Sequence, residues 1–470
     1  MSKRDLVIIG GGAGGLIVAS VAAQLGLKVT LIEKEEKLGG DCLHYGCVPS
    51  KTLIKSAKVA SLMRRATEFG LNAVNSKVDL AKVNDHVQSV IEHIQHHDDP
   101  ERFRGYGCEV LFGHAEFIDA YSVKVNDQII KGKRFVVATG SRSFIPPVRG
   151  LEETGYLTNV DLFSLRELPE RLVVLGGGAI GLEMGQAFAR LGSKVTILQR
   201  AERILPQEDP ELSGALHQAL VAEGITIHTS TEAKRIYQNN NAATIECDSS
   251  LKIEADQILV ATGRQANTNG LGLDVAGVDY NKRGIKVDRR MRTSQKHIYA
   301  CGDVCGPYLF THMAEYQAGI VISNAIFRFP KKTHYKVIPW VTYTEPELAR
   351  VGLTEQQARE QGMEPTVLHF EFKDNDRALT EVETQGLYKL VTHKGKILGA
   401  SILGPHAGEL IHEIVLAMQA GIKIGAISAA IHAYPTLAQI HRRTVNSGYA
   451  PKLFSAATRR FVKWINILLP

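Results

Sequence analysis

A glycine-rich turn between an apolar strand and a helix occurs twice in this chain and constrains the fold more than any other feature. The first copy spaces Gly10, Gly12 and Gly15 as G-x-G-x-x-G directly after the apolar run Leu-Val-Ile-Ile. The first glycine makes the bend, the second lets backbone approach a pyrophosphate, and the third lets helix and strand pack closely. Glu33 ends the next apolar strand, where a carboxylate can hold ribose hydroxyls. Strand, turn, helix and acid together predict a dinucleotide site.

The second copy has the same glycine spacing but ends without an acid. Its three glycines are Gly176, Gly178 and Gly181. The strand that follows ends in Gln199-Arg200, so a ribose 2′-hydroxyl lacks its usual carboxylate acceptor, whereas a guanidinium suits a 2′-phosphate. The pattern favours NADPH, with NADH as the other donor. The alternative is that Arg200 and the nearby Arg203 only cover a solvated loop.

Two cysteines lie five residues apart in the segment Cys42-Leu-His-Tyr-Gly-Cys47-Val-Pro-Ser-Lys51. On an undistorted helix their axial separation of roughly 7.5 Å exceeds the Cα separation of roughly 7 Å that a disulfide tolerates. Gly46 can supply a tight backbone that brings them together, and a helix can start just past Cys47. A thiol at a helix N-terminus has a lowered pKa. The segment predicts a redox-active pair; a structural bridge or a metal half-site is the alternative.

Three further apolar strands support this arrangement. Two of them end in Ala-Thr-Gly, at Gly140 and at Gly263, one for each nucleotide-binding unit. The third starts at Ile298 and ends in Cys-Gly-Asp303. Alone, Gly-Asp would indicate a turn. Beside two nucleotide folds and a redox pair, the Asp303 carboxylate is placed to accept hydrogen bonds from the ribityl chain of a flavin.

The composition narrows the class of protein further. A chain of 470 residues predicts two or three domains, and six cysteines are too few for a disulfide scaffold. The net charge of +6 is modest and no dense basic run precedes the last twenty residues, so nucleic-acid binding is not expected. The first residues indicate a buried strand rather than a signal peptide, and no apolar run reaches transmembrane length. We therefore expect a cytoplasmic globular protein.

Three histidines, His93, His96 and His97, cluster at the end of the helical run 83–97. A metal site there would need an acidic or sulfur ligand, and none is spaced to complete it. We expect a solvated helix end and no bound metal.

These motifs together resemble the flavin-dependent pyridine nucleotide–disulfide oxidoreductases, the family of glutathione reductase, dihydrolipoamide dehydrogenase and mercuric reductase. The resemblance implies an α/β fold with two doubly wound, Rossmann-like nucleotide-binding domains and a C-terminal α+β dimerisation domain. It also implies FAD on the first fold, NAD(P)H on the second, and a homodimer. The boundaries expected are 1–150 with 270–340 for the FAD domain, 151–269 for the NAD(P)H domain, 341–450 for the dimerisation domain and 451–470 for a basic amphipathic tail.

The resemblance also assigns roles to residues. Cys47 would be the flavin-proximal thiolate and Cys42 the thiol that exchanges with the acceptor. Lys51 would pair with Glu183 near flavin N5, where an ammonium offsets the negative charge gained on reduction. The alternative for Glu183 is an ordinary carboxylate on a helix face.

The C-terminal region departs from the pattern of the family's disulfide reductases. They carry His-x-His-Pro-Thr, and a glutamate follows the second histidine by five positions. The second histidine is the general acid/base for thiol exchange and acts on the disulfide of the partner subunit. This chain has His432-Ala-Tyr434-Pro-Thr, and Gln439 replaces the glutamate. A tyrosine hydroxyl is in general too weak an acid, with a reference pKa of about 10, to serve as a good base near neutrality. His432 is expected to be structural, and His441 is a weaker candidate to replace the missing histidine.

Mercuric reductase is similar in carrying a tyrosine at this position, since metal reduction needs thiolates to hold the ion rather than a proton shuttle. The 470 residues contain neither an N-terminal CxxC domain nor vicinal cysteines near the C-terminal end, so efficient mercury detoxification is not expected. We predict an FAD-dependent NAD(P)H oxidoreductase that reduces or oxidises a disulfide, dithiol or soft-metal acceptor. The alternatives are a dihydrolipoamide dehydrogenase activity, a quinone or oxygen reductase that uses flavin directly, and a non-catalytic flavoprotein that senses nucleotide ratio at membranes.

The last segment, 452–469, alternates basic and apolar residues. Arg459, Arg460 and Lys463 are interspersed with apolar side chains that include Phe461 and Trp464. As a helix the segment has a charged side and an aromatic side, which could lie on a membrane surface and bring quinones or membrane-held thiols within reach. The alternative, which the sequence favours slightly, is a terminal helix packed across the dimer.

Overall fold

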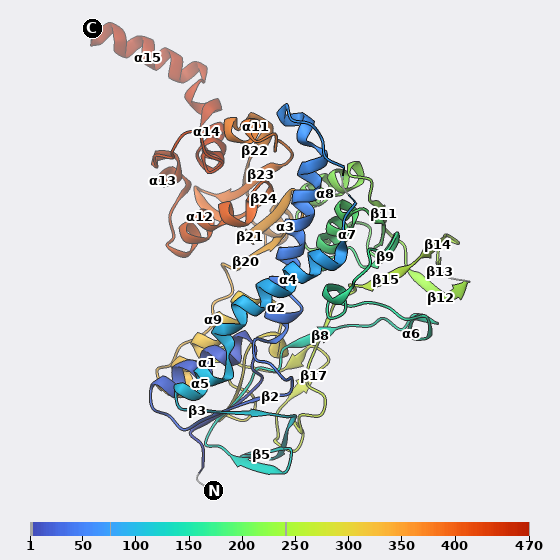
Figure 1. Cartoon of the computed structure of the whole chain (residues 1–470). Helices are drawn as coiled ribbons and strands as arrows, with labels where there is room; N and C mark the ends of the chain where they lie inside the picture. Colours follow the sequence, from blue (N-terminus) through green and yellow to red (C-terminus); the bar gives the residue numbers. More distant parts are fainter. Residues whose placement is uncertain (1–2, 76, 240–241, 470) are drawn as a thin grey trace.

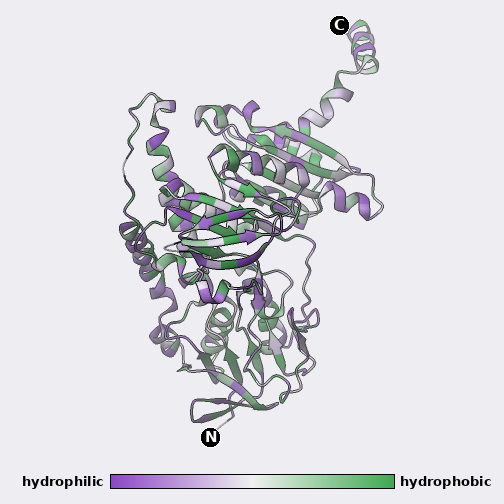
Figure 2. Cartoon of the chain, turned by 90° about the vertical axis from the view of Figure 1, so that its right-hand side faces the viewer, coloured by the Kyte–Doolittle hydropathy of each residue, from purple (hydrophilic) through white to green (hydrophobic). Residues whose placement is uncertain are grey.

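The computed structural model describes residues 3–75, 77–239 and 242–469. The chain forms three sheet-containing units, and its last helix projects from the body (Figure 1). Figure 2 shows both hydrophobic and hydrophilic residues along strands and helices. Strands that are covered on both faces are nearly all apolar, whereas half-exposed strands and helices carry both kinds of residue.

The first sheet is parallel and has the strand order β19-β7-β1-β2-β3. Its strands are Ile298–Ala300 (β19), Phe135–Val137 (β7), Leu6–Ile9 (β1), Val29–Glu33 (β2) and Cys108–Phe112 (β3). Successive residues of β1 point to opposite faces, so that Leu6 packs into one core cluster and Val7 into another. Because both faces are covered, β1 is a continuous apolar run rather than an alternating one.

Helices cover one face of this sheet and a small antiparallel sheet covers the other. α1 (Ala13–Gln24) and α9 (Thr311–Val321) pack together over the face that Leu6 belongs to. The opposite face packs against β4 (Ala115–Asp119), β5 (Ser122–Val125) and β6 (Gln128–Lys131). β19 follows the second unit in sequence, so strands from both sides of that unit build the first sheet. The domain boundaries drawn from the sequence stay a proposal.

The second unit repeats the strand–turn–helix arrangement of the first. Its parallel sheet has the order β11-β10-β9-β15, formed by Thr226–His228 (β11), Lys194–Leu198 (β10), Arg171–Leu175 (β9) and Gln257–Val260 (β15). α7 (Ala179–Leu191) follows the glycine turn and α8 (Pro210–Ala222) packs nearby, capped by the Asp209 side chain. An antiparallel sheet of β12 (Ala233–Asn239), β13 (Ala242–Cys247) and β14 (Lys252–Ala255) lies beside it.

The third unit is an antiparallel sheet with helices, in the order β20-β21-β24-β23-β22. Its strands are Pro339–Thr342 (β20), Glu347–Gly352 (β21), Lys396–Gly404 (β24), Leu387–His393 (β23) and Thr366–Glu371 (β22). Its helices are α10 (Glu355–Glu360), α11 (Asp376–Thr380), α12 (Ala407–Gln419), α13 (Ile424–Ala429), α14 (Gln439–Leu453) and the projecting α15 (Ala456–Leu468).

Helices after β2 link the units. α2 (Gly40–His44) and α3 (Cys47–Arg64) follow β2 directly, and α3 packs against α4 (Leu80–Gln95) and α7. The chain segment with the two cysteines therefore lies between the first and second units. β8 (Ser141–Ser143) and β16 (Arg264–Ala266) pair antiparallel.

Candidate active site

The two cysteines lie on either side of a break between α2 and α3. At Gly46 a Cβ would lie 2.9 Å from the Asp41 carbonyl oxygen and 3.2 Å from the Cys42 Cα, so glycine permits the close approach of the two helices. α3 begins at Cys47 itself, earlier than the start around Pro49-Ser50-Lys51 that the sequence indicated. Its thiol therefore sits at a helix N-terminus, where backbone dipoles favour a thiolate.

The two thiols are both free in this structure, and their pKa values are shifted in opposite directions. A hydrogen bond from Cys42 lowers the pKa of Cys47 to about 6 against the effect of burial, and the Thr311 hydroxyl and Lys51 ammonium contribute to the same lowering. That hydrogen bond, together with burial, raises the pKa of Cys42. The pair can therefore hold one thiolate and one thiol at neutral pH.

Thr311 is a member of the site that the sequence did not indicate. Its Oγ1 lies 3.4 Å from the Cys47 Sγ, across 264 residues of chain. Thr311 is the first residue of α9, the helix that packs beside α1. The first sheet and its helices thus bring the start of α9 to the start of α3.

Lys51 and Glu183 meet, as the resemblance implied. Lys51 lies one turn after Cys47 on α3, and its Nζ donates to Glu183 Oε2 at 2.8 Å. Glu183 is buried on α7, and its other oxygen accepts from the Tyr343 backbone N–H at 2.9 Å. The Lys51 ammonium also lies 4.4 Å from the Tyr343 ring centroid, a cation–π distance. Burial lowers the pKa of Lys51, but the charge and hydrogen bond of Glu183 raise it by more, so the pKa of Lys51 lies above its ordinary value.

The first glycine turn has the geometry that a dinucleotide needs. Gly10 has φ +110°, and a Cβ there would lie 2.3 Å from the Ala138 carbonyl oxygen. At Gly15 a Cβ would lie 1.9 Å from the Gly10 carbonyl oxygen. The Gly11 N–H donates to Glu33 Oε2 at 2.6 Å, so the carboxylate that ends β2 also holds the turn.

The second turn repeats these contacts with an amide in place of the carboxylate. Gly176 has φ +114°, and at Gly181 a Cβ would lie 2.0 Å from the Gly176 carbonyl oxygen. The Gly177 N–H donates to Gln199 Oε1 at 3.1 Å, across the same 22 residues that separate Gly11 from Glu33. Gln199 therefore occupies the position of Glu33 without its negative charge. Arg200, the next residue, is exposed.

A partly buried polar network surrounds Asp303, three residues after the end of β19. Its carboxylate accepts from Ser141 Oγ at 2.6 Å, and burial raises its pKa. Arg264 Nε donates to Ser141 Oγ at 2.7 Å, and its Nη2 donates to Asp41 Oδ2 at 3.0 Å. Asn159 donates to the other Asp41 oxygen at 3.1 Å. The sequence indicated Asp303 but missed Arg264 and Asp41, although the first follows Ala-Thr-Gly263 and the second precedes Cys42.

Comparison with known proteins identifies the group to which this geometry belongs. Residues 4–318 match the pyridine nucleotide-disulphide oxidoreductases, and residues 338–444 match the dimerisation domain of the same group. The chain belongs to this family. Members of the pyridine nucleotide–disulphide oxidoreductase family are FAD-dependent enzymes with NAD(P)H as electron donor. The predicted family, fold class, enzyme class and cofactors are thereby confirmed, and the dimerisation domain supports a homodimer.

Relatives within this family differ in their named substrates. The chain is 37% identical to the mercuric reductase of Bacillus cereus over 441 residues, which covers 93% of this chain and 70% of that protein. It is 38% identical to the dihydrolipoyl dehydrogenase of Bacillus subtilis over 451 residues, 93% of this chain and 95% of that protein. A similar solved structure is the Cu(II) complex of the HOCl-induced flavoprotein disulfide reductase RclA of Escherichia coli, with 29% identity, a TM-score of 0.86, and coverage of 95% of this chain and 100% of that one.

The residues of the first unit fit the FAD that the family uses. Gly12 is the N-cap of α1 and has no side chain to fill the space before the helix N-terminus, where a pyrophosphate would bind. A Cβ at Gly40 would lie 2.8 Å from the Gly12 Cα, so two glycine segments line this approach. Gly12, Glu33 and Asp303 would hold the dinucleotide at its pyrophosphate, its adenosine ribose and its ribityl chain, respectively.

The two C-terminal histidines, His432 and His441, both lie close to Glu413. His441 is 1% exposed, its Nε2 lies 3.8 Å from Glu413, and its ring packs edge-on against Tyr388. Burial lowers the pKa of His441 and keeps the ring neutral. His432 Nε2 lies 3.2 Å from a Glu413 oxygen. Tyr434 is 69% exposed. His441 is thus a core side chain, which removes the candidate that the sequence left open.

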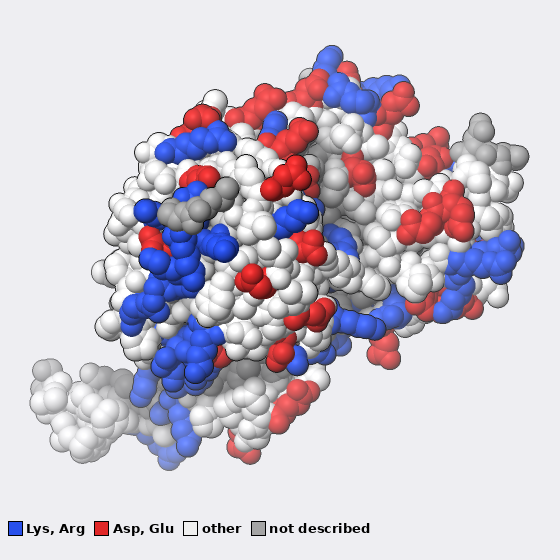
Figure 3. All heavy atoms as spheres, turned by 90° about the horizontal axis from the view of Figure 1, so that it is seen from below, with Lys and Arg blue, Asp and Glu red and all other residues white. Residues whose placement is uncertain are grey.

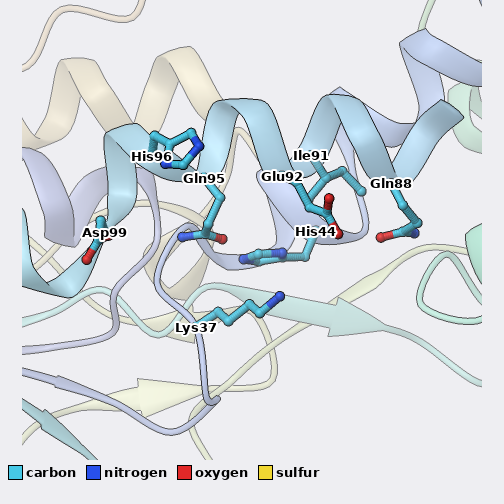
Figure 4. Close-up of a pocket in the computed structure, with 8 residues that line it drawn as sticks. All are labelled: Lys37, His44, Gln88, Ile91, Glu92, Gln95, His96 and Asp99. Carbon is cyan, nitrogen blue, oxygen red and sulfur yellow. The ribbon is translucent and has the colours of Figure 1, made fainter. Parts of the chain in front are cut away.

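A separate pocket of about 250 Å³ lies on the outer side of the cysteine segment (Figure 4). Side chains of α4 face His44 and Lys37 across it, and the lining residues are Lys37, His44, Gln88, Ile91, Glu92, Gln95, His96 and Asp99. His44 Nε2 lies 2.9 Å from the Leu38 carbonyl oxygen, so this ring holds the loop before α2. The pocket contains neither cysteine, and the described residues include no group of three or more His, Cys, Asp or Glu side chains placed to hold a metal ion.

Proposed function

We propose that this protein is an NADPH-linked flavoenzyme that transfers electrons through Cys47 and Cys42 to a sulfur-containing or soft-metal acceptor. The observation that supports this most directly is the acidic Cys47 thiol at the start of α3, beside the Lys51–Glu183 ion pair. Bound FAD would accept hydride from the nicotinamide and supply two electrons to the cysteine pair.

The charges around the cysteines suit this task. The Lys51 ammonium favours the Cys47 thiolate and would offset negative charge on a reduced cofactor beside it. Glu183 holds Lys51 in place and is itself fixed by the Tyr343 backbone. Removal of Glu183 would leave a partly buried ammonium without its partner, so this carboxylate acts by positioning Lys51.

The dithiol can reduce an acceptor disulfide in two balanced steps. The Cys42 sulfur, after losing its proton, attacks one acceptor sulfur and displaces the other as a thiolate. The Cys47 thiolate then attacks the Cys42 sulfur, closes the Cys42–Cys47 disulfide and displaces the second acceptor thiolate. Two electrons pass to the acceptor, and protons from Cys42 and solvent neutralise its two sulfurs.

The first step is where this chain differs from fast disulfide reductases. The pKa of Cys42 is raised, so the attacking thiol needs a base, and Tyr434 and Gln439 stand where the family's disulfide reductases place histidine and glutamate. Without such a base, a soft metal ion is a better acceptor than a disulfide. The metal ion displaces the thiol proton when it binds and therefore needs no proton shuttle. The similarity to mercuric reductases supports the same preference.

The acidity of Cys47 gives the first test of this proposal. In the reduced protein, thiolate absorbance and the thiolate–flavin charge-transfer band should persist at neutral pH and fall as the pH drops through about 6. Thr311→Val should raise this midpoint, because it removes a hydroxyl 3.4 Å from Cys47 Sγ that stabilises the thiolate. Cys247→Ser, in the antiparallel sheet of the second unit, is the control and should leave the midpoint unchanged. A midpoint near the ordinary thiol value of about 8.5 would contradict the proposal.

The choice of NADPH follows from Gln199 and can be tested separately. Gln199→Glu should shift the ratio of kcat/KM for NADH over NADPH at least about tenfold toward NADH, because a carboxylate accepts from a 2′-hydroxyl and repels a 2′-phosphate. The turn should remain intact, since Glu33 makes the equivalent contact with Gly11. Steady-state kinetics with both nucleotides measure the ratio, and Gln207→Glu, on the exposed loop that follows, is a matched control. An unchanged ratio would mean that Gln199 does not face the ribose.

A further inference from the structure

The helix α15 makes no buried contact with the rest of the described chain. It spans Ala456–Leu468, starts at a Ser455 cap that accepts from the Thr458 N–H at 3.2 Å, and has no buried residue. It projects from the body at the C-terminal end of Figure 1. A helix of 13 residues is marginal alone in water and owes its stability to packing of its apolar face. Some surface outside the described chain is therefore needed to cover it.

The two sides of α15 have different chemistry. Phe461, Trp464, Ile465 and Leu468 follow the spacing i, i+3, i+4, i+7 and share one side, on which Phe461 and Trp464 stack with a centroid distance of 6.3 Å. The opposite side carries Arg459, Arg460 and Lys463. Figure 2 shows both hydrophilic and hydrophobic residues along this helix.

The charge on α15 is of one sign only. From Lys452 to Leu469 the sequence contains four basic residues and no Asp or Glu. On the body of the molecule, in contrast, basic and acidic side chains both occur across the face in Figure 3. A surface of only positive charge beside exposed aromatic rings complements an anionic lipid surface, where cations meet phosphate and aromatic rings enter the interface.

We propose that α15 binds the surface of an anionic lipid bilayer and lies in its plane. The helix is about 20 Å long, shorter than the roughly 30 Å hydrocarbon core, and no described helix is long and apolar enough to cross a membrane. A second copy of the chain is a weaker candidate for the covering surface. The residues that match the family's dimerisation domain end at 444, before α15 begins, and the positive charges of two copies of this helix repel each other, whereas anionic lipid attracts them.

Co-sedimentation of the FAD-loaded protein with vesicles tests this directly. Binding is expected to phosphatidylcholine vesicles that contain phosphatidylglycerol, to weaken with salt, and to be nearly absent with phosphatidylcholine alone. Replacing Arg459, Arg460 and Lys463 by glutamine should weaken binding about 100-fold, from the contribution of three cations near the surface. Equal binding to both kinds of vesicle, or no binding to either, would overturn the proposal.

The aromatic side gives an independent readout with a matched control. Phe461→Ser with Trp464→Ser should weaken vesicle binding at least about tenfold. The control is Leu71→Ser with Val275→Ser, which should leave vesicle binding unchanged. These two apolar side chains are 66% and 63% exposed, similar to Phe461 and Trp464 at 56% and 58%. Trp464 is one of only two tryptophans, so its fluorescence should shift to the blue on vesicles. If the aromatic variant instead turns a dimer into monomers and wild type ignores vesicles, α15 covers a second copy and the proposal is wrong.

Discussion

Cys42→Ser should lower NADPH-dependent turnover of a disulfide or soft-metal acceptor by about a thousandfold or more, which is typical of losing an essential nucleophile. Serine keeps the size of the side chain but cannot form the bond to sulfur or metal that carries the two electrons. NADPH should still bleach the flavin in this variant, because Cys47, Lys51 and Glu183 stay in place. Stopped-flow bleaching and steady-state turnover measure the two steps separately.

The same variant distinguishes the remaining functions. A quinone or oxygen reductase that uses flavin directly would keep its turnover in Cys42→Ser, and a non-catalytic flavoprotein would show no turnover in wild type with any acceptor. Cys108→Ser, a buried cysteine on β3, is the control for a general effect of losing a thiol. Full disulfide and metal turnover in Cys42→Ser would disprove the route through the cysteine pair. It would leave the lipid-binding proposal for α15 untouched.

Tyr434→His combined with Gln439→Glu should raise disulfide turnover by about 100-fold, the lower range of what a positioned acid/base contributes. An imidazole titrates near neutrality and, in the arrangement that the family resemblance implies, would take the proton from Cys42 of the partner subunit, a thiol whose pKa is raised in this protein. Tyr434 is exposed, so a histidine there replaces no core packing. Turnover with lipoamide or glutathione disulfide measures the gain, and soft-metal turnover should change little.

The single variants serve as controls for this gain. Tyr434→His alone should give a smaller increase, because the ring lacks the carboxylate that orients it, and Gln439→Glu alone should give none. Tyr434→Phe should keep the wild-type rates if the phenol takes no part in proton transfer. A folded, flavin-loaded double variant without any gain would show that the missing dyad is not what limits exchange.

The residues that could be predicted from the sequence are those fixed by local geometry. Gly10 and Gly176 have positive φ, and a Cβ on either would collide with a backbone carbonyl next to a neighbouring strand. Only glycine can occupy such positions, so the G-x-G-x-x-G spacing predicts them. Gly46 has a negative φ, but there a Cβ would lie 3.2 Å from the Cys42 Cα, so glycine lets Cys42 and Cys47 approach. Lys51 and Glu183 were paired only through the family resemblance, since 132 residues separate them.

Contacts between distant segments could not be predicted. Thr311 reaches Cys47 across 264 residues and Arg264 reaches Asp41 across 223, and nothing in the local sequence of either residue points to its partner. His441 was a candidate base beside two arginines, and only the packing of α14 showed it to be buried against Tyr388.

The sequence by itself determined the two nucleotide folds, the cysteine pair and the absence of the histidine–glutamate dyad, because each depends on which side chains occur at short, fixed spacings. The tertiary structure alone decided which residues surround the Cys47 thiol, that His441 is a core residue, and that α15 leaves its aromatic side uncovered. These depend on how helices and sheets pack across hundreds of residues, and a linear pattern does not contain that information.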